Sequence, residues 1–193
     1  MLLFPRNNRN NSGFTLIEVV VALTIVAMMA GLMMSNYREG EKINKLVLQS
    51  QELSTDIRKV QNNTLGAAKY GTSTPEGGWG IHIDLGESEK EYKLFANKNY
   101  DSDDDGDPDN FEYDSGEALP EKGGQTMELE EGVKIASTTV GDYLDITFIP
   151  PDPKTVFWDG SSTTSDASIT LENKSGTTRK VKVNSFGSIE VVK

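Results

Sequence analysis

The apolar run from Phe14 to Met34 constrains this chain more than any other part of the sequence. As an α-helix rising about 1.5 Å per residue, its 21 residues would be about 31 Å long. The hydrocarbon core of a bilayer is about 30 Å thick, so the run predicts a membrane-spanning helix. Its one charged residue is Glu18. A carboxylate within a membrane costs about 2.5–3.5 kcal/mol, and we therefore expect Glu18 to have a partner and a function.

The segment before this run, residues 1–13, contains two arginines and no acidic residue. Positive residues at this place keep the N-terminus in the cytoplasm, so the rest of the chain is predicted to cross the membrane and lie outside. The segment differs from a secretory signal peptide, because its Gly13-Phe14 junction precedes the apolar run and no small-residue cleavage site follows the run.

The hexapeptide from Gly13 to Glu18, Gly-Phe-Thr-Leu-Ile-Glu, resembles the prepilin signature of type IV pilins and pseudopilins at every position. The resemblance implies that a prepilin peptidase cleaves between Gly13 and Phe14 and that the new amine of Phe14 is N-methylated. It also implies that Glu18 is the counter-charge for the Phe14 ammonium of a neighbouring subunit in a filament. Both charges are costly when unpaired in an apolar bundle, so their pairing would set the register between subunits. The alternative is a plain signal anchor, with Glu18 near the lipid headgroups.

Beyond Met34 an amphipathic pattern predicts that the helix continues to about Leu65, with Gly66 and Gly71 as stop signals. Apolar or small residues recur at three- and four-residue spacings, namely Ile43, Leu46, Ser50, Leu53, Ile57 and Val60. We expect this stripe to pack on the chain's own β-rich remainder; the rival interpretation is a coiled-coil seam with another subunit.

The remainder of the chain predicts an antiparallel β head. Strands are expected at 79–85, 92–96, 127–136, 143–149, 156–158, 168–171, 179–184 and 188–192, with a hairpin turn at 184–187. Strict alternation in the first strand would place Trp79 and Ile81 on the buried face and His82 on the solvated face. The predicted fold class is therefore α+β and pilin-like: leader 1–13, membrane or filament-core helix 14–34, amphipathic helix 35–66 and head 67–193. The tail more loosely resembles minor pseudopilins of the GspH/FimT type, in which a long helix packs on a two-sheet head.

An acidic segment within the head, residues 101–112, fits the calcium-loop pattern D-x-D-x-D-G-x5-E. The expected ligands, supplied by side chains or, at position 107, by the backbone carbonyl, are Asp101, Asp103, Asp105, Asp107, Asp109 and Glu112. Pro108 and the lack of flanking amphipathic helices favour a single inserted loop, similar to those of dockerin or thrombospondin repeats, over an EF-hand. Magnesium fits less well because it prefers a stiffer shell and keeps its waters. The alternative is a solvated acidic loop that binds no cation.

Composition narrows the function classes. The formal net charge is −11 and becomes −13 without residues 1–13, which disfavours broad binding to nucleic acid. One histidine and no cysteine leave few routes to an active site, so a non-enzymatic role is expected. We predict a subunit of a type IV pilus or a type II secretion pseudopilus, in the inner membrane and then in the filament. The open alternatives are the major shaft pilin and a DNA-binding minor pilin using the basic residues near Arg179, Lys180 and Lys182.

Overall fold

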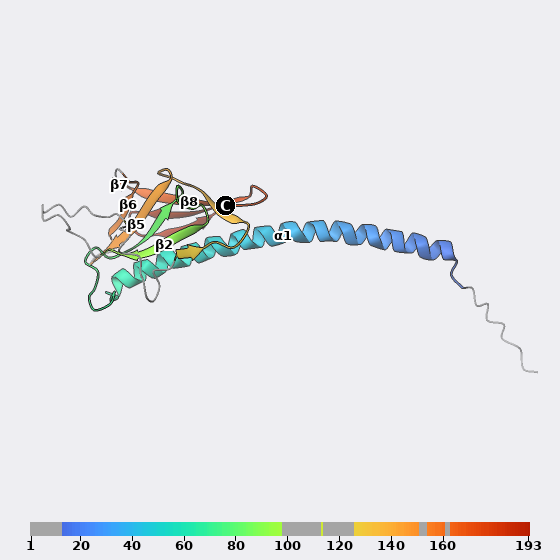
Figure 1. Cartoon of the computed structure of the whole chain (residues 1–193), viewed down its shortest axis with the longest axis horizontal. Coiled ribbons are helices and arrows are strands. Elements are labelled where there is room, and N and C mark those ends of the chain that lie inside the picture. The colour runs from blue at the N-terminus through green and yellow to red at the C-terminus, as the bar shows by residue number, and fades with distance from the viewer. Residues whose placement is uncertain (1–12, 98–112, 114–125, 151–153, 161–162) are drawn as a thin grey trace, which may run out of the picture. The chain divides into compact units, whose positions relative to one another are not determined.

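The computed structural model describes residues 13–97, 113, 126–150, 154–160 and 163–193. The chain divides into two compact units, residues 1–40 and residues 41–193. One helix of 50 residues, α1 (Leu16–Leu65), contributes to both units (Figure 1). From Leu16 to Met34 the helix carries apolar side chains on all sides around its axis, with Glu18 and Thr24 as its polar residues, and these side chains are exposed; Phe14, just before the helix, is 88% exposed and Met28 is 72% exposed.

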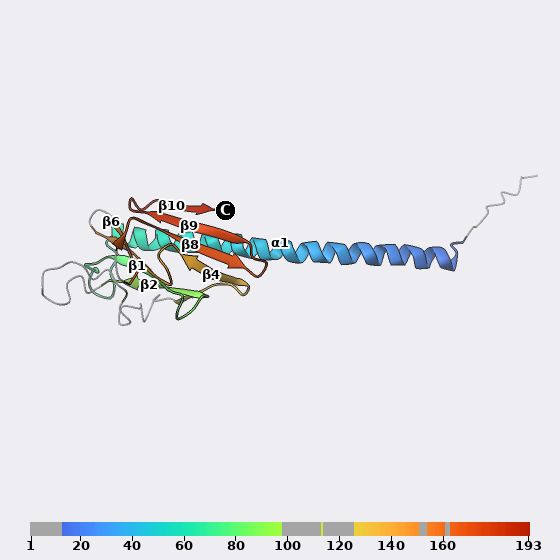
Figure 2. The same cartoon turned by 90° about the horizontal axis from the view of Figure 1, so that it is seen from above.

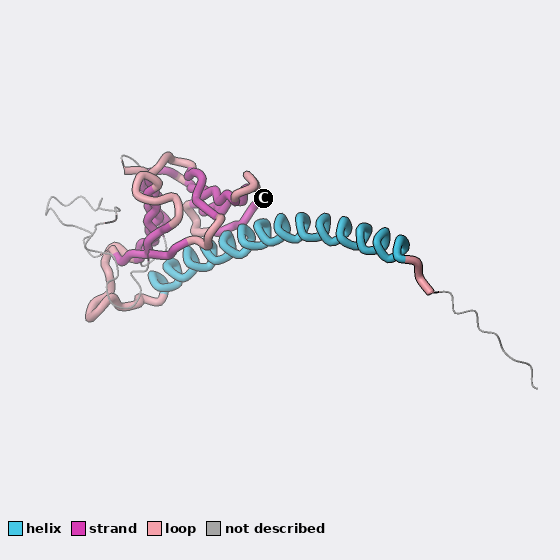
Figure 3. Tube along the Cα trace, turned by 45° about the vertical axis from the view of Figure 1, so that its right-hand side comes forward, coloured by secondary structure: helices cyan, strands magenta, loops and turns pink. Residues whose placement is uncertain are grey.

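The second unit contains the predicted antiparallel β head, and the α+β fold class is confirmed. The first sheet, which we call sheet B, has the order β3-β2-β1-β5-β6-β7, and the second, sheet C, has the order β10-β9-β8-β4. The strands of sheet B are β1 (Trp79–Asp84), β2 (Glu91–Ala96), β3 (Thr126–Glu128), β5 (Tyr143–Ile149), β6 (Lys154–Trp158) and β7 (Thr163–Thr164). Those of sheet C are β4 (Val133–Thr138), β8 (Asp166–Asn173), β9 (Thr178–Asn184) and β10 (Ile189–Val192) (Figures 2 and 3).

One hydrophobic core joins both sheets and the second half of α1. The helix contributes Leu46, Leu53, Ile57 and Val60, each at most 1% exposed. Alternate residues of β1, β5, β8 and β9 complete the core, among them Ile81, Ile83, Ile146, Phe148, Ile169, Leu171, Val181 and Val183. Packing within the chain is thus confirmed over the coiled-coil alternative, although Ile43 is exposed and the buried stripe begins at Leu46.

Two polar contacts fix the helix on sheet B. Thr64 donates a hydrogen bond to the Phe148 carbonyl (3.1 Å) and accepts one from the Trp79 backbone amide (3.1 Å). About two helical turns before Thr64, the Asp56 carboxylate accepts a hydrogen bond from the hydroxyl of Tyr92 on β2 at 2.7 Å, and both residues are buried. Burial, followed by this hydrogen bond to a carboxylate, raises the pKa of the Tyr92 hydroxyl far above its usual range.

The helix ends at Leu65, as predicted, but the residue that stops it differs from the expected one. Ala67, and not Gly66, adopts the left-handed conformation (φ 47°). The Ala68 amide donates to the Asn63 carbonyl (2.8 Å) and the Ala67 amide donates to the Thr64 carbonyl (3.1 Å), which together form a Schellman motif. Gly66 and Gly71 were expected as stop signals, but the register of these two bonds makes Ala67 the left-handed residue that ends the helix.

The expected strand 127–136 is wrong as a single element. It divides into β3 in sheet B and β4 in sheet C. Between them the Val133 amide donates to the Glu130 carbonyl (3.0 Å), and Gly132 has a φ of +101°, which an L-residue with a side chain rarely adopts. This turn moves the chain from one sheet to the other. The two-residue β7 was not predicted.

Candidate functional site

The N-terminal end of α1 is closed by a capping box built from Thr15 and Glu18. The Thr15 amide and hydroxyl both donate to Glu18 Oε2, at 2.9 and 2.8 Å, and the Glu18 amide lies 3.4 Å from Thr15 Oγ1. Such a reciprocal pair satisfies backbone donors that otherwise have no partner at a helix start. The capping role of Thr15 was not predicted from the sequence, although the Thr-x-x-Glu spacing is the usual signal for this motif.

The capping box leaves part of the Glu18 carboxylate available. Both hydrogen bonds from Thr15 go to Oε2, so among the described residues Oε1 of Glu18 has no hydrogen-bond partner. The cap also holds the carboxylate next to the helix N-terminus, where a negative charge is favourable. The arrangement can therefore accept an external cation through Oε1 while the helix stays capped.

The predicted processing residues lie directly before this cap. Gly13 and Phe14 are exposed and non-helical, which leaves the peptide bond between them accessible from solvent. The apolar run follows at once, and α1 is the one helix in the described part of the chain that is long and apolar enough to cross a membrane. Its Thr24 hydroxyl donates to the Val20 carbonyl (2.8 Å), so this polar group is satisfied within the helix.

A second cluster lies on the face of sheet B that carries His82, and here the expectation for that residue is wrong. His82 is only 4% exposed, although alternation placed it on the solvated face. The β-ladder registers set Lys93 of β2 and Asp145 of β5 on either side of it. The Tyr113 ring stacks on the imidazole at a centroid distance of 4.3 Å. Gly80 leaves room on the same face for Phe95, because a Cβ at Gly80 would lie 2.5 Å from the Phe95 ring.

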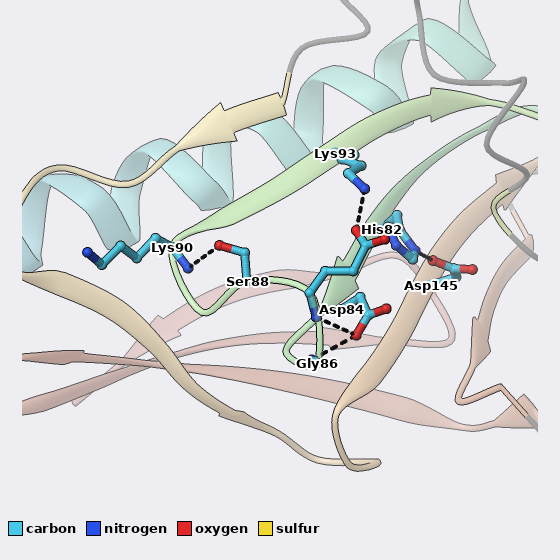
Figure 4. Close-up of polar contacts among 8 residues, drawn as sticks. His82, Asp84, Gly86, Ser88, Lys90, Lys93 and Asp145 are labelled. Carbon is cyan, nitrogen blue, oxygen red and sulfur yellow. Dashed lines mark hydrogen bonds and ion pairs between the residues drawn. The ribbon is translucent and has the colours of Figure 1, made fainter.

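Asp145 is the centre of this cluster. It is fully buried and accepts hydrogen bonds from His82 Nδ1 (2.7 Å), the Tyr113 amide (2.8 Å) and the Tyr143 hydroxyl (3.0 Å). A buried carboxylate is tolerated when several donors surround it, as they do here. Figure 4 shows the contact of His82 with Asp145. No pattern in the sequence predicts this cluster, because His82 and Asp145 are brought together only by the pairing of β1 with β5.

The predicted calcium loop, residues 101–112, lies outside the described residues, and its ligand set stays a prediction. What the structure describes is its surroundings. The segment 97–125 connects β2 and β3, two neighbouring antiparallel strands of sheet B. Tyr113 follows Glu112 directly and is held by Asp145, by the His82 ring and by the Phe95 ring at 5.6 Å. Tyr113, the residue after the acidic segment, is thereby held on sheet B.

Close to this cluster, Lys93 forms an ion pair with Glu87 in the turn between β1 and β2 (2.6 Å). The hydrogen bond to Glu87 and, less strongly, the surrounding negative charges raise the pKa of the Lys93 ammonium. Lys93 also lies 5.4 Å from the centroid of the Tyr113 ring.

The basic residues considered for nucleic-acid binding lie among acidic ones. Lys180 and Lys182 are exposed on β9, and Glu190 of β10 stands in register opposite Lys182. Lys174 pairs with Glu131 at 3.1 Å. A phosphate backbone needs a surface with an excess of positive charge, and this pairing reduces the excess here.

Comparison with known proteins gives one match. Residues 8–34 match a family model described as the prokaryotic N-terminal methylation motif, a span that includes Gly13, Phe14 and Glu18. No curated protein and no solved structure is significantly similar to the chain.

Proposed function

We propose that the chain is a non-enzymatic filament subunit of the type IV pilin and pseudopilin family, because residues 8–34 match the N-terminal methylation motif. Its head would lie outside the cytoplasm, held by a single membrane helix until the subunit enters a filament. A prepilin peptidase would process it, and other pilin subunits would be its partners through the N-terminal half of α1.

The observation that carries this proposal is the exposure of the apolar half of α1. Its side chains cover all sides of the helix and are exposed, as Leu23, Met28 and Leu32 illustrate. A helix that is apolar all round requires either lipid or other helices around it. Storage in a membrane followed by bundling with the helices of other subunits supplies both environments in turn.

Glu18 would select the height at which a subunit joins the bundle. Cleavage after Gly13 creates a positive amine on Phe14, and Oε1 of Glu18 is left free by the capping box. A subunit added at another height would leave both charges unpaired in an apolar surrounding, which costs several kcal/mol. The capping box would hold the carboxylate in one orientation before the amine arrives.

Within the family, we propose that this is a minor subunit of the GspH/FimT type. Support comes from the two-sheet head with the helix packed into its core. A major shaft pilin is the alternative, and the number of copies in a filament distinguishes the two.

The acidic segment is proposed to bind calcium in a structural role. Its support is the ligand spacing of residues 101–112 and the fixed Tyr113 at the end of the segment. Calorimetric titration of the full chain with Ca²⁺ tests this: Asp103→Asn is expected to weaken binding at least tenfold, while Glu190→Gln on β10 leaves it unchanged. Equal binding by wild type and Asp103→Asn would refute the loop.

Quantitative mass spectrometry of filaments sheared from the native cells tests the main proposal. The expected N-terminus is methylated Phe14, and a trace amount per filament supports a minor subunit. An amount equal to the filament mass would identify the shaft pilin. An unprocessed Met1 in the membrane fraction would refute the assignment altogether.

Two matched variants separate the charge of Glu18 from its capping role. Glu18→Gln keeps the size of the side chain and removes its charge, so incorporation into filaments is expected to fall at least tenfold with normal membrane insertion. Thr15→Ala removes part of the cap and keeps the charge, so incorporation is expected to change little. Normal incorporation of Glu18→Gln would contradict the register role.

A further inference from the structure

Three side chains with metal-ligating atoms converge at the end of β1. His82 and Asp84 are two residues apart and therefore lie on the same face of the strand, and Glu87 follows in the turn to β2. One ring nitrogen of His82 and one carboxylate oxygen from each acid all lie within 4.8 Å of one another. Together with Ser88, Glu91, Tyr92 and Lys93, these three residues line a small hollow of about 10 Å³, which has room for about one water molecule or ion.

The histidine is held in the orientation that a metal ligand requires. Its Nδ1 lies 2.7 Å from Asp145 Oδ1, and Asp145 accepts two further hydrogen bonds. Since a carboxylate accepts hydrogen bonds, Nδ1 is the donor to Asp145, and Nε2 is the ring nitrogen left for a metal ion. Among the described residues Nε2 has no hydrogen-bond partner, although the His82 side chain is 4% exposed. Carboxylates orient metal-binding histidines in this way.

The two acids are also oriented and retain free oxygens. Asp84 Oδ1 accepts hydrogen bonds from the backbone amides of Gly86 (2.8 Å) and Glu87 (3.3 Å), which fixes the carboxylate and leaves Oδ2 (Figure 4). Glu87 binds Lys93 through Oε2 and keeps Oε1. The site thus offers one imidazole nitrogen and two carboxylate oxygens around a volume of ionic size.

We propose that His82, Asp84 and Glu87 bind a divalent transition-metal ion of the zinc type. The mixed nitrogen and oxygen donors suit zinc or cobalt, while calcium takes oxygen ligands only. Three protein ligands leave a fourth position for water, and the exposed Glu87 makes the site exchangeable with solvent. The bound ion would join the β1–β2 turn to the strand that carries His82, independently of the filament role and of residues 101–112.

Lys93 would compete with this ion for the Glu87 carboxylate. Its ammonium lies 2.6 Å from the Glu87 carboxylate and lines the same hollow. Two positive charges so close together repel one another, so removal of the lysine charge is expected to raise the metal affinity. This expectation is specific, because a lysine that only supported the turn would lower affinity when replaced.

The test uses the full chain in detergent micelles, purified without a polyhistidine tag. The chain has a single histidine, so its imidazole gives one set of NMR signals without any assignment. Addition of Zn²⁺ is expected to shift the Nε2 resonance of His82, and Co²⁺ is expected to give the visible absorption of a four-coordinate ion. Absence of both signals would overturn the proposal.

Variants identify the ligands. Glu87→Gln and Asp84→Asn are expected to weaken Zn²⁺ binding at least tenfold, and Lys93→Met is expected to strengthen it several-fold. Glu89→Gln, an exposed acid in the same turn, is the matched control and should bind as the wild type does. Asp103→Asn in the acidic segment should also bind Zn²⁺ normally. If Asp103→Asn abolishes binding, or if Glu87→Gln and Asp84→Asn leave it unchanged, the proposed site is wrong.

Discussion

The two halves of α1 have the same backbone conformation and opposite surroundings. Up to Met34 the helix exposes apolar side chains on all sides, whereas between Leu46 and Val60 its buried apolar residues form one stripe in the core of the head. Leu23 is 64% exposed and Leu53 is fully buried. The comparison shows that a continuous helix can belong to two structures: its second half completes the head core, and its first half requires an environment that the chain does not supply.

Truncation should separate the halves most strongly. A chain of residues 41–193 is expected to fold without detergent, because every helix residue in the core is retained. A chain of residues 66–193 is expected not to fold, since it loses Leu46, Leu53, Ile57 and Val60 from the core. Circular dichroism and thermal unfolding measure both. Cooperative unfolding of 66–193 would contradict the assignment of the helix to the core.

The same substitution in each half should give unequal losses. Leu53→Ala creates a cavity in the core and is expected to lower the free energy of unfolding of the head by about 2–5 kcal/mol. Leu23→Ala removes an exposed side chain and should change it by less than about 0.5 kcal/mol. Urea unfolding of the full chain in detergent compares them, and equal losses would show that the first half also stabilises the head.

A smaller loss is expected at the polar contact between helix and sheet. Tyr92→Phe leaves the buried Asp56 carboxylate without its hydrogen-bond donor at 2.7 Å, which should cost about 1–3 kcal/mol. Tyr37→Phe, at a 75% exposed residue of the first half, is the matched control and should be neutral. Urea unfolding at pH 7 measures both variants. An unchanged free energy of unfolding in Tyr92→Phe would mean that solvent replaces the lost hydrogen bond to Asp56.

The smallest expected effect is a pH dependence of the free energy of unfolding that arises from the Tyr92–Asp56 contact. An unfolded tyrosine loses its proton near pH 10, and the raised pKa of folded Tyr92 prevents this in the native state. The contribution is therefore complete below about pH 10 and is lost above it, by at most about 1.4 kcal/mol per pH unit. Tyr92→Phe should flatten the fall between about pH 10 and 11, and Tyr37→Phe should not. An unchanged slope in Tyr92→Phe would locate the effect elsewhere.

Much of the fold could be predicted because its signals are local. The end of the helix at Leu65 and the strand Tyr143–Ile149 follow from periodicity along short stretches. The errors arose where neighbouring elements decide. Residues 127–136 alternate like one strand, but the turn at Gly132 assigns them to two sheets. Alternation placed His82 in solvent because it cannot foresee that Tyr113 covers that face.

The sequence by itself determined the N-terminal motif, the length of the helix and the change of its apolar pattern from all-round to one-sided, because each depends on residues close together in the chain. The tertiary structure alone decided the cluster around Asp145, the polar contact of Asp56 with Tyr92 and the burial of His82 against the Tyr113 ring. Asp145 meets His82 across 63 residues of sequence. Such contacts depend on strand order and register, which are set by the burial of the whole core.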